Sequence, residues 1–327
     1  MVNHTVVWAG VASRTHLVYG ASWIRELTRQ QPGDVTVEMM GSRTFFGDEA
    51  ITPAVVADLL PDHVTVVPWS NAATPKDRQL WMLSVGAVGI KPWLRLHAKN
   101  PGRRFEVIVS DEGLGSYGNW FSRREAHRRQ GVNEPWRSVR TSAVETATWA
   151  LTSTRWPLHV ETTKGWALNK PAADEFRRLA PEPEVADRVV FISQPWPELG
   201  IMDESEYLHH LDDVARASRA AGLEFVVLPH PGEPRRRFDH LDVAGGSEMA
   251  ECNAKALGAK LLAGASSTAM LNLAAIHGIP AVRVGTPQLA DLDRKLAPRQ
   301  ASLLSRYAAP SLSPEAFGRR LSQGLGF

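Results

Sequence analysis

The sequence has one cysteine among its 327 residues, so no disulfide bond can form within the chain. Cys252 lies in a segment with a helical pattern, 248–260, where we expect a small buried apolar residue. No apolar run reaches the ~18 residues that a membrane-spanning helix needs. Residues 1–10 lack the basic region and following apolar region of a signal peptide. We therefore expect a cytoplasmic protein with no transmembrane segment.

The sequence also lacks a large net charge and the glycine-rich loops that bind phosphates or dinucleotides. The net charge of +2 gives no general attraction to nucleic acid, so we expect no nucleic-acid partner. Neither a G-x-x-x-x-G-K-[ST] loop nor a G-x-G-x-x-G after the first predicted strand occurs. Asp291 and Asp293 form a D-x-D in a predicted helix, where a solvated face is expected, and His209-His210 has no partner ligands. We predict neither a metal site nor a cofactor.

Predicted strands alternate with predicted helices, which is typical of a parallel sheet with helical crossovers. In the first half we predict strands at 5–9, 34–40, 63–68 and 104–110, and helices at 15–29, 77–99 and 138–151. Segment 156–170 is expected to be irregular. In the second half we predict strands at 188–192, 223–228, 260–263 and 280–284, and helices at 205–221, 252–257 and 267–277.

The prolines of segment 171–187 suggest a linker between two domains. We predict an α/β fold with two Rossmann-like domains facing across a cleft. The predicted N-terminal domain is 1–170, the C-terminal domain is 188–305, and a helical tail occupies 306–327.

His230 is the first candidate for chemistry. It follows the predicted strand 223–228, and Pro231 and Gly232 end that strand, so the imidazole lies at the carboxyl end. In open α/β sheets that edge binds ligands, and the pKa of histidine suits proton transfer near neutrality. The alternative is a histidine that merely ends a strand.

Two adjacent carboxylates, Asp111 and Glu112, follow the predicted strand 104–110. Gly113 and Gly115 let the chain bend tightly there. A carboxylate whose pKa is raised by burial or by its neighbour can act as a general base. The alternative is an ordinary turn, in which Asp and Gly are frequent.

Hydroxyl groups gather where the predicted strand 260–263 meets the helix 267–277. Ser266, Ser267 and Thr268 and their backbone N–H groups lie at the start of this helix, which suits a phosphate group. Simple capping by Ser266 or Ser267 is the alternative. Gln194 follows strand 188–192 and can donate and accept hydrogen bonds, unless it is only a loop residue before Pro195.

Arg123, Arg124, Arg128 and Arg129 follow the acidic pair closely. A solvated basic helix and a binding segment for an anionic acceptor are both open interpretations. Binding of such an acceptor should weaken with salt, because exposed charges are screened.

Together these stretches resemble the bacterial sialyltransferases of the polysialyltransferase and lipooligosaccharide-sialyltransferase type. That family shares, in this order, a D/E-D/E-G motif, an HP motif and a Ser-Ser motif. The corresponding residues here are Asp111-Glu112-Gly113, His230-Pro231 and Ser266-Ser267. Segment 192–233 matches further, with a Gln-Pro after its strand, a Gly-Ile pair, an acidic helix start and a glutamate after the HP pair. The first half matches mainly at 111–113 and loosely at 13–17.

The resemblance implies a GT-B fold, with domain 1–170 on the acceptor side and domain 188–305 binding the nucleotide sugar. It also implies a metal-independent, inverting transfer. The donor would be a CMP-activated nonulosonic acid, such as sialic acid, and the acceptor a hydroxyl of a glycan or another molecule. By analogy Asp111 would deprotonate the acceptor hydroxyl, with Glu112 as the adjacent alternative. His230 would protonate or stabilise the departing CMP phosphate, which needs donors already in place. The residues expected to bind substrate are Gly113, Gln194, Pro231, Ser266, Ser267 and Thr268.

Two other functions fit the same residues. A GT-B-shaped sugar-nucleotide epimerase also uses histidine and carboxylates in a cleft, and it would act without an acceptor. A degenerate module could bind the nucleotide sugar without transferring it, although the presence of Asp111, Glu112 and His230 argues against this. The chain is short for a polymerase of the family, which argues against processive synthesis.

Overall fold

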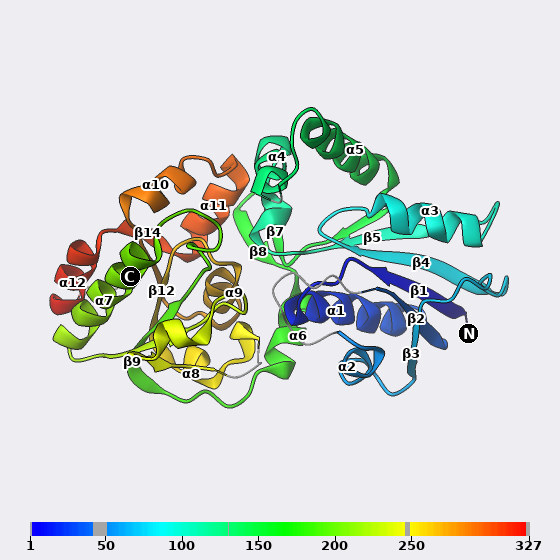
Figure 1. Ribbon diagram of the computed structural model, residues 1–327. Coiled ribbons are helices and arrows are strands. Elements are labelled where there is room, and N and C mark those ends of the chain that lie inside the picture. Colours follow the sequence, from blue (N-terminus) through cyan, green and yellow to red (C-terminus); the bar gives the residue numbers. More distant parts are fainter. Residues whose placement is uncertain (1, 42–50, 130, 246–248, 325–327) are drawn as a thin grey trace. The chain divides into compact units, whose positions relative to one another are not determined.

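The computed structural model describes residues 2–41, 51–129, 131–245 and 249–324. They form two units, Met1–Glu175 and Phe176–Phe327, and each unit is built around a six-stranded parallel sheet (Figure 1). Helices connect the strands in both units. The prediction of two Rossmann-like α/β domains is confirmed.

The N-terminal sheet has the strand order β3-β2-β1-β4-β5-β6. Its strands are β1 (Asn3–Ala9), β2 (Val35–Met40), β3 (Val64–Pro68), β4 (Arg78–Val85), β5 (Glu106–Ser110) and β6 (Thr154–Trp156). Its helices are α1 (Arg14–Gln30), α2 (Pro53–Ala57), α3 (Ile90–Lys99), α4 (Trp120–Arg129) and α5 (Trp136–Leu151). A single-turn helix η1 (Leu114–Tyr117), the hairpin β7 (His159–Thr162) and β8 (Gly165–Leu168), and α6 (Lys170–Leu179) complete this part of the chain.

Both faces of this sheet are covered. Along β1, Val6 and Trp8 point to the face that α1 covers, whereas Val7 and Ala9 point to the face that α3 covers. A strand buried on both sides favours apolar residues at successive positions, which explains the apolar run 6–9 of β1.

The C-terminal sheet has the order β11-β10-β9-β12-β13-β14. Its strands are β9 (Ala186–Ile192), β10 (Glu224–Leu228), β11 (Asp242–Val243), β12 (Ala259–Gly264), β13 (Ala281–Val284) and β14 (Ala309–Leu312). Its helices are α7 (Glu204–Ala220), η2 (Arg235–Phe238), η3 (Ala250–Cys252), α8 (Ala254–Leu257), α9 (Thr268–His277), α10 (Pro287–Asp293), α11 (Pro298–Tyr307) and α12 (Pro314–Ser322). α7 and α9 cover opposite faces, against Phe191 and Ile192 respectively.

In each sheet the chain adds strands first on one side of the initial strand and then on the other. The order reverses between β1 and β4 in the N-terminal unit, and between β9 and β12 in the C-terminal unit. The crevice at the carboxyl ends of such strands is where open α/β sheets bind ligands. These two places are therefore where functional side chains are expected.

The predicted helix 77–99 is wrong in its first half. Residues Arg78–Val85 form β4, the strand next to β1, and only Ile90–Lys99 are helical. β4 is buried on both faces over most of its length, so its sequence lacks the alternation that identifies a half-exposed strand. Gly86, at a φ of +70°, ends it.

Three further segments differ from the sequence prediction. Segment 156–170, expected to be irregular, contains the β7–β8 hairpin. The expected linker 171–187 contains most of α6 and the start of β9, and the units divide at 175/176. The expected helical tail 306–327 contributes β14 to the sheet before α12 begins; its residues 325–327 lie outside the described residues. The expectation that Cys252 is buried is confirmed, at 8% exposure.

His210 titrates with an unusually low pKa in the core of the C-terminal unit. The side chain is 3% exposed, contacts Phe191 and Trp196, and has no hydrogen-bond partner at either ring nitrogen within the described residues. Burial lowers the pKa of His210 from 6.5 to about 4. The folded protein therefore holds this ring neutral at physiological pH.

We predict that His210 makes the protein less stable in acid. Between pH 6.5 and about 4 the unfolded chain binds a proton that the folded chain does not, so the free energy of unfolding should fall as the pH is lowered. The loss should reach roughly 3 kcal/mol. His210→Leu should flatten the dependence, whereas His209→Leu, at a side chain 75% exposed, should not. Urea unfolding across this pH range measures it; an unchanged slope in His210→Leu would contradict the assignment.

Candidate active site

Three neighbouring strands of the C-terminal sheet bring the predicted donor-side residues to one edge. Strands β10, β9 and β12 are paired in parallel register, so the residues that follow them emerge together. These residues are His230, Gln194 and Ser266–Thr268, in that order across the sheet. Gln194 accepts a hydrogen bond at Oε1 from the backbone N–H of Ser266, at 3.2 Å. Gln194 thus fixes the loop after β12 to the end of β9, across the point where the strand order reverses.

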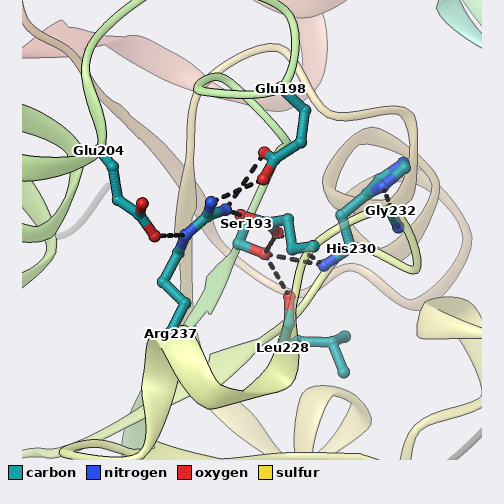
Figure 2. A network of polar contacts seen from close by, with 8 residues as sticks. Ser193, Glu198, Glu204, Leu228, His230, Gly232 and Arg237 are labelled. Atoms are coloured by element: carbon teal, nitrogen blue, oxygen red, sulfur yellow. Dashed lines mark hydrogen bonds and ion pairs between the residues drawn. The ribbon is translucent and has the colours of Figure 1, made fainter.

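The loop after β10 holds His230 by its backbone and by its ring (Figure 2). The backbone N–H of His230 donates to Ser193 Oγ at 2.8 Å and to Glu233 Oε2 at 2.9 Å. Ring Nδ1 accepts from the backbone N–H of Gly232 at 3.0 Å. Because Nδ1 is an acceptor, the neutral imidazole carries its proton on Nε2. The loop therefore selects the tautomer in which Nε2 is a donor.

Ser193 and Glu233 form a buried clamp under this loop. Ser193 lies within hydrogen-bond distance of both the Leu228 carbonyl oxygen, at 3.2 Å, and Glu233 Oε2. One hydroxyl proton cannot serve both oxygens, so the contacts are all satisfied when Glu233 itself carries a proton. Burial raises the pKa of Glu233 in that direction, although its hydrogen bonds oppose the shift.

Arg237 anchors the other end of the loop. Its side chain is 3% exposed and lies 2.6 Å from Glu198, 3.0 Å from Glu204 and 3.4 Å from Glu233 (Figure 2). A buried guanidinium needs such partners, because an unpaired charge in the interior is costly. In the sequence, Glu233 is noted only as the glutamate after the HP pair, and Ser193 and Arg237 are not identified. The available signal is the Glu and Arg three and seven residues after the histidine.

The N-cap residue of α9 does not cap the helix with its own side chain. Ser267 is the N-cap residue, with φ −70° and ψ 132°, but its side chain makes no capping hydrogen bond in the described structure. Simple capping by Ser267, the alternative considered above, is therefore wrong. Arg283, on β13, donates to the Ala265 carbonyl oxygen at 3.2 Å and pairs with Asp293 of the D-x-D sequence. Because Arg283 is paired with Asp293, its contact with Ala265 holds the loop, and the dipole at the start of α9 is what favours an anion here.

The two adjacent carboxylates of the N-terminal unit have opposite environments. Asp111 is 2% exposed and accepts hydrogen bonds at Oδ2 from the Tyr117 hydroxyl, at 2.5 Å, and from the Leu158 N–H, at 2.9 Å. Burial raises the pKa of Asp111, while the bonds from Tyr117 and Leu158 partly offset it. Asp111 therefore joins the end of β5 to the segment that leads into the β7–β8 hairpin.

Glu112 is exposed and lies over the point where the strand order reverses. A Cβ added to Gly86, at the end of β4, would meet Glu112 Oε2 at 2.0 Å, and one on Gly115 would meet Oε1 at 2.8 Å. Two glycines thus make room for this carboxylate. Gly113, expected to bind substrate, is buried at a φ of +106°, so the structure gives it a conformational role.

His16, in the first turn of α1, joins the β1 loop to the Glu112 turn. Its Nδ1 accepts from the Ala12 N–H at 3.1 Å, and it hydrogen-bonds the Glu112 backbone. Desolvation lowers the pKa of His16 to about 4, although the bond to Glu112 opposes the shift. The neutral ring therefore fixes the backbone of Glu112. Residues 13–17 matched the family only loosely, and a histidine after the first strand was the available signal.

The remaining predicted residues are placed as follows. Pro231 is exposed in the His230 loop, and Thr268 is the half-buried first residue of α9. In the arginine cluster, Arg123 pairs with Glu145, Arg124 with Glu134 and Arg128 with Glu125. The side chain of Arg129 lies outside the described residues. The described arginines of this cluster are thus largely neutralised by carboxylates of their own segment.

We predict that Asp111 matters for stability and Glu112 does not. Asp111→Ala leaves the Tyr117 hydroxyl and the Leu158 N–H without their acceptor, which should cost about 2–4 kcal/mol. Glu112→Ala removes an exposed side chain and should change the free energy of unfolding by less than ~0.5 kcal/mol. Chemical denaturation of both variants tests this, and equal stability of the two would refute the structural role of Asp111.

No protein-family model matches the chain, and no curated protein matches it in sequence. Several solved structures are similar. The glycosyltransferase of kitacinnamycin has a TM-score of 0.51 at 14% identity, over 98% of this chain and 93% of that one. A Listeria monocytogenes protein described as a UDP-N-acetylglucosamine 2-epimerase has a TM-score of 0.57 at 8% identity, over 98% and 88%. A 2,6-sialyltransferase from Photobacterium, solved with CMP and lactose, has a TM-score of 0.49 at 12% identity, over 94% and 78%.

At these identities the likeness shows the fold alone. The first two structures match nearly the whole of this chain, and both units are Rossmann-like. The chain has the GT-B fold.

Proposed function

We propose that the chain is an inverting, metal-independent glycosyltransferase that moves sialic acid, or a related nonulosonic acid, from a CMP-activated donor to a hydroxyl of a glycan or small molecule. The observation that supports this most is the shared sheet edge of His230 and the α9 N-terminus. His230 supplies an N–H donor at Nε2, and the α9 N-terminus supplies the positive end of a helix dipole for a phosphate.

In this proposal residues of the C-terminal unit bind the leaving group, CMP. The bond between the anomeric carbon and the CMP phosphate oxygen breaks, and its electron pair remains on that oxygen. His230 donates a hydrogen bond from Nε2–H to the departing phosphate and keeps its proton, while Ser266, Ser267 and the N–H groups of α9 bind the other oxygens. Gln194 keeps this loop in place through the Ser266 N–H. Pre-positioned donors of this kind stabilise charge as it develops.

The N-terminal unit supplies the base. We assign this role to Glu112, because a base must contact the acceptor hydroxyl and Glu112 is the exposed carboxylate. The acceptor proton passes to Glu112, and the acceptor oxygen attacks the anomeric carbon from the face opposite the phosphate, so the configuration inverts. Asp111, which the family resemblance favoured, supports the turn from within.

The epimerase alternative shares the fold but requires different behaviour. An epimerase would change the configuration of its sugar without any acceptor. Epimerisation of a nucleotide sugar by this protein in the absence of an acceptor would therefore overturn the transferase proposal. CMP release that depends on an added glycan acceptor would support it.

We predict that Ser266 and Ser267 contact the phosphate. Replacing both by alanine should weaken CMP binding by about tenfold or more, because a hydrogen bond to a charged group contributes ~1.5–3 kcal/mol. Cytidine has no phosphate and should bind the variant as it binds the original protein. The Gln194 bond uses the Ser266 backbone and survives the change. Calorimetry with both ligands measures this difference. Equal losses of affinity for CMP and cytidine would show that Ser266 and Ser267 do not contact the phosphate.

We also predict that His230→Ala and Glu112→Gln lose turnover while folding normally. Each should lower the acceptor-dependent release of CMP from CMP-sialic acid by roughly 10²–10⁴-fold, because His230→Ala removes a pre-positioned donor to the developing charge and Glu112→Gln removes a general base. Asp111→Asn is the comparison for Glu112→Gln, with unfolding curves measured in parallel. If Asp111→Asn stays folded and inactive while Glu112→Gln stays active, the base is Asp111.

A further inference from the structure

Helix α5 turns an almost uncharged face to solvent. Exposed helix faces of globular proteins are normally charged or polar. On α5 the exposed residues are Trp136, Val139, Arg140, Ser142, Ala143, Thr146, Trp149 and Ala150. Trp136 is 71% exposed, Val139 53% and Trp149 84%. Neighbouring α4 adds Phe121, at 73% (Figure 1).

Specific contacts on the opposite side fix this orientation. Thr148 Oγ1 accepts from the Val88 N–H at 3.1 Å, and Thr141 Oγ1 is hydrogen-bonded to His127 of α4 at 2.9 Å. At the margin of the exposed face, Trp120 of α4 also donates to Ser142 Oγ at 3.1 Å. At a rise of ~1.5 Å per residue, Trp136 and Trp149 lie roughly 20 Å apart along the helix. At 3.6 residues per turn the two tryptophans also lie roughly 140° apart around the helix axis, so they stand at opposite margins and opposite ends of the exposed surface.

The α4–α5 segment, 120–151, is also basic. It contains six arginines, at 123, 124, 128, 129, 137 and 140, and three glutamates, at 125, 134 and 145, so its net charge is +3. Arg140 borders the apolar face, and within the described ranges no carboxylate pairs with it. An apolar face beside excess positive charge favours an anionic surface.

We propose that the outward face of α5 binds the surface of an anionic membrane. Tryptophan is favoured at the level of lipid headgroups, where its ring is partly buried and its N–H stays hydrated. Arg140 would contact lipid phosphate at the edge of the face. The helix has 16 residues, and no described helix is long and apolar enough to cross a bilayer, so α5 lies along the surface.

A second copy of the chain is a poorer occupant of this face. A symmetric dimer places the same surface patch on both subunits, so the +3 charge of each segment would face its own kind. The small alanine, serine and threonine side chains between the tryptophans also give little depth for the interlocking that stable protein interfaces need. A fluid lipid surface needs no such shape match. The proposal does not depend on the transfer reaction.

Vesicle co-sedimentation of the full chain tests the proposal. We expect binding to phosphatidylcholine vesicles in which phosphatidylglycerol replaces about a third of the lipid, weaker binding to pure phosphatidylcholine, and loss of binding at high salt. Trp136→Ser/Trp149→Ser should weaken binding about tenfold or more. Arg140→Glu should weaken it at least about fivefold on the anionic vesicles only.

The matched control is Val185→Ser/Leu199→Ser, which removes apolar side chains 83% and 38% exposed in the C-terminal unit. This control should bind vesicles like the unchanged chain. The proposal fails if the unchanged chain does not bind anionic vesicles, or if the tryptophan variant binds them equally well. It also fails if sedimentation velocity shows a dimer that the tryptophan variant dissociates, because a second copy would then cover the face.

Discussion

The two parallel sheets determine where the candidate functional side chains of this protein lie, which is at the carboxyl ends of the strands. The central strands are largely apolar on both faces, and the candidate functional side chains follow the points where those strands end. In both units the strand order reverses beside the first strand, and there the polar residues collect. Glu112 lies at one of these places, and Gln194 and Ser266 lie at the other. A change in strand order would disperse both groups.

At each edge a buried carboxylic acid supports an accessible functional group. In the N-terminal unit Asp111 holds the turn next to Glu112, through Tyr117 and Leu158. In the C-terminal unit Glu233 and Ser193 hold the backbone of His230. Burial raises the pKa of both Asp111 and Glu233, so each resists ionisation and acts as a structural hydrogen-bonding group. The proposed chemistry is left to the neighbours that these groups position.

The sequence predicted the fold class and most of the elements, because apolar strands alternate with amphipathic helices along nearly the whole chain. It missed β4, whose burial on both faces removes the alternation on which strand prediction depends. It found His230, Gln194 and the serine pair because turn residues mark strand ends. It could not find the Ser193–Glu233 clamp or separate Asp111 from Glu112, because adjacent residues acquire opposite burial only through packing with distant segments such as Tyr117 and Leu158.

The proposed transfer depends first on the binding of CMP by the C-terminal unit. Thermal unfolding of the full chain with CMP, UDP, GDP or ADP measures this directly, because a ligand that binds only the folded state stabilises it. At ~100 times its dissociation constant a ligand adds about 2.7 kcal/mol. We expect CMP to raise the Tm and the other three nucleotides to leave it nearly unchanged. A rise with UDP and none with CMP would rule out a CMP-sugar donor and favour the epimerase.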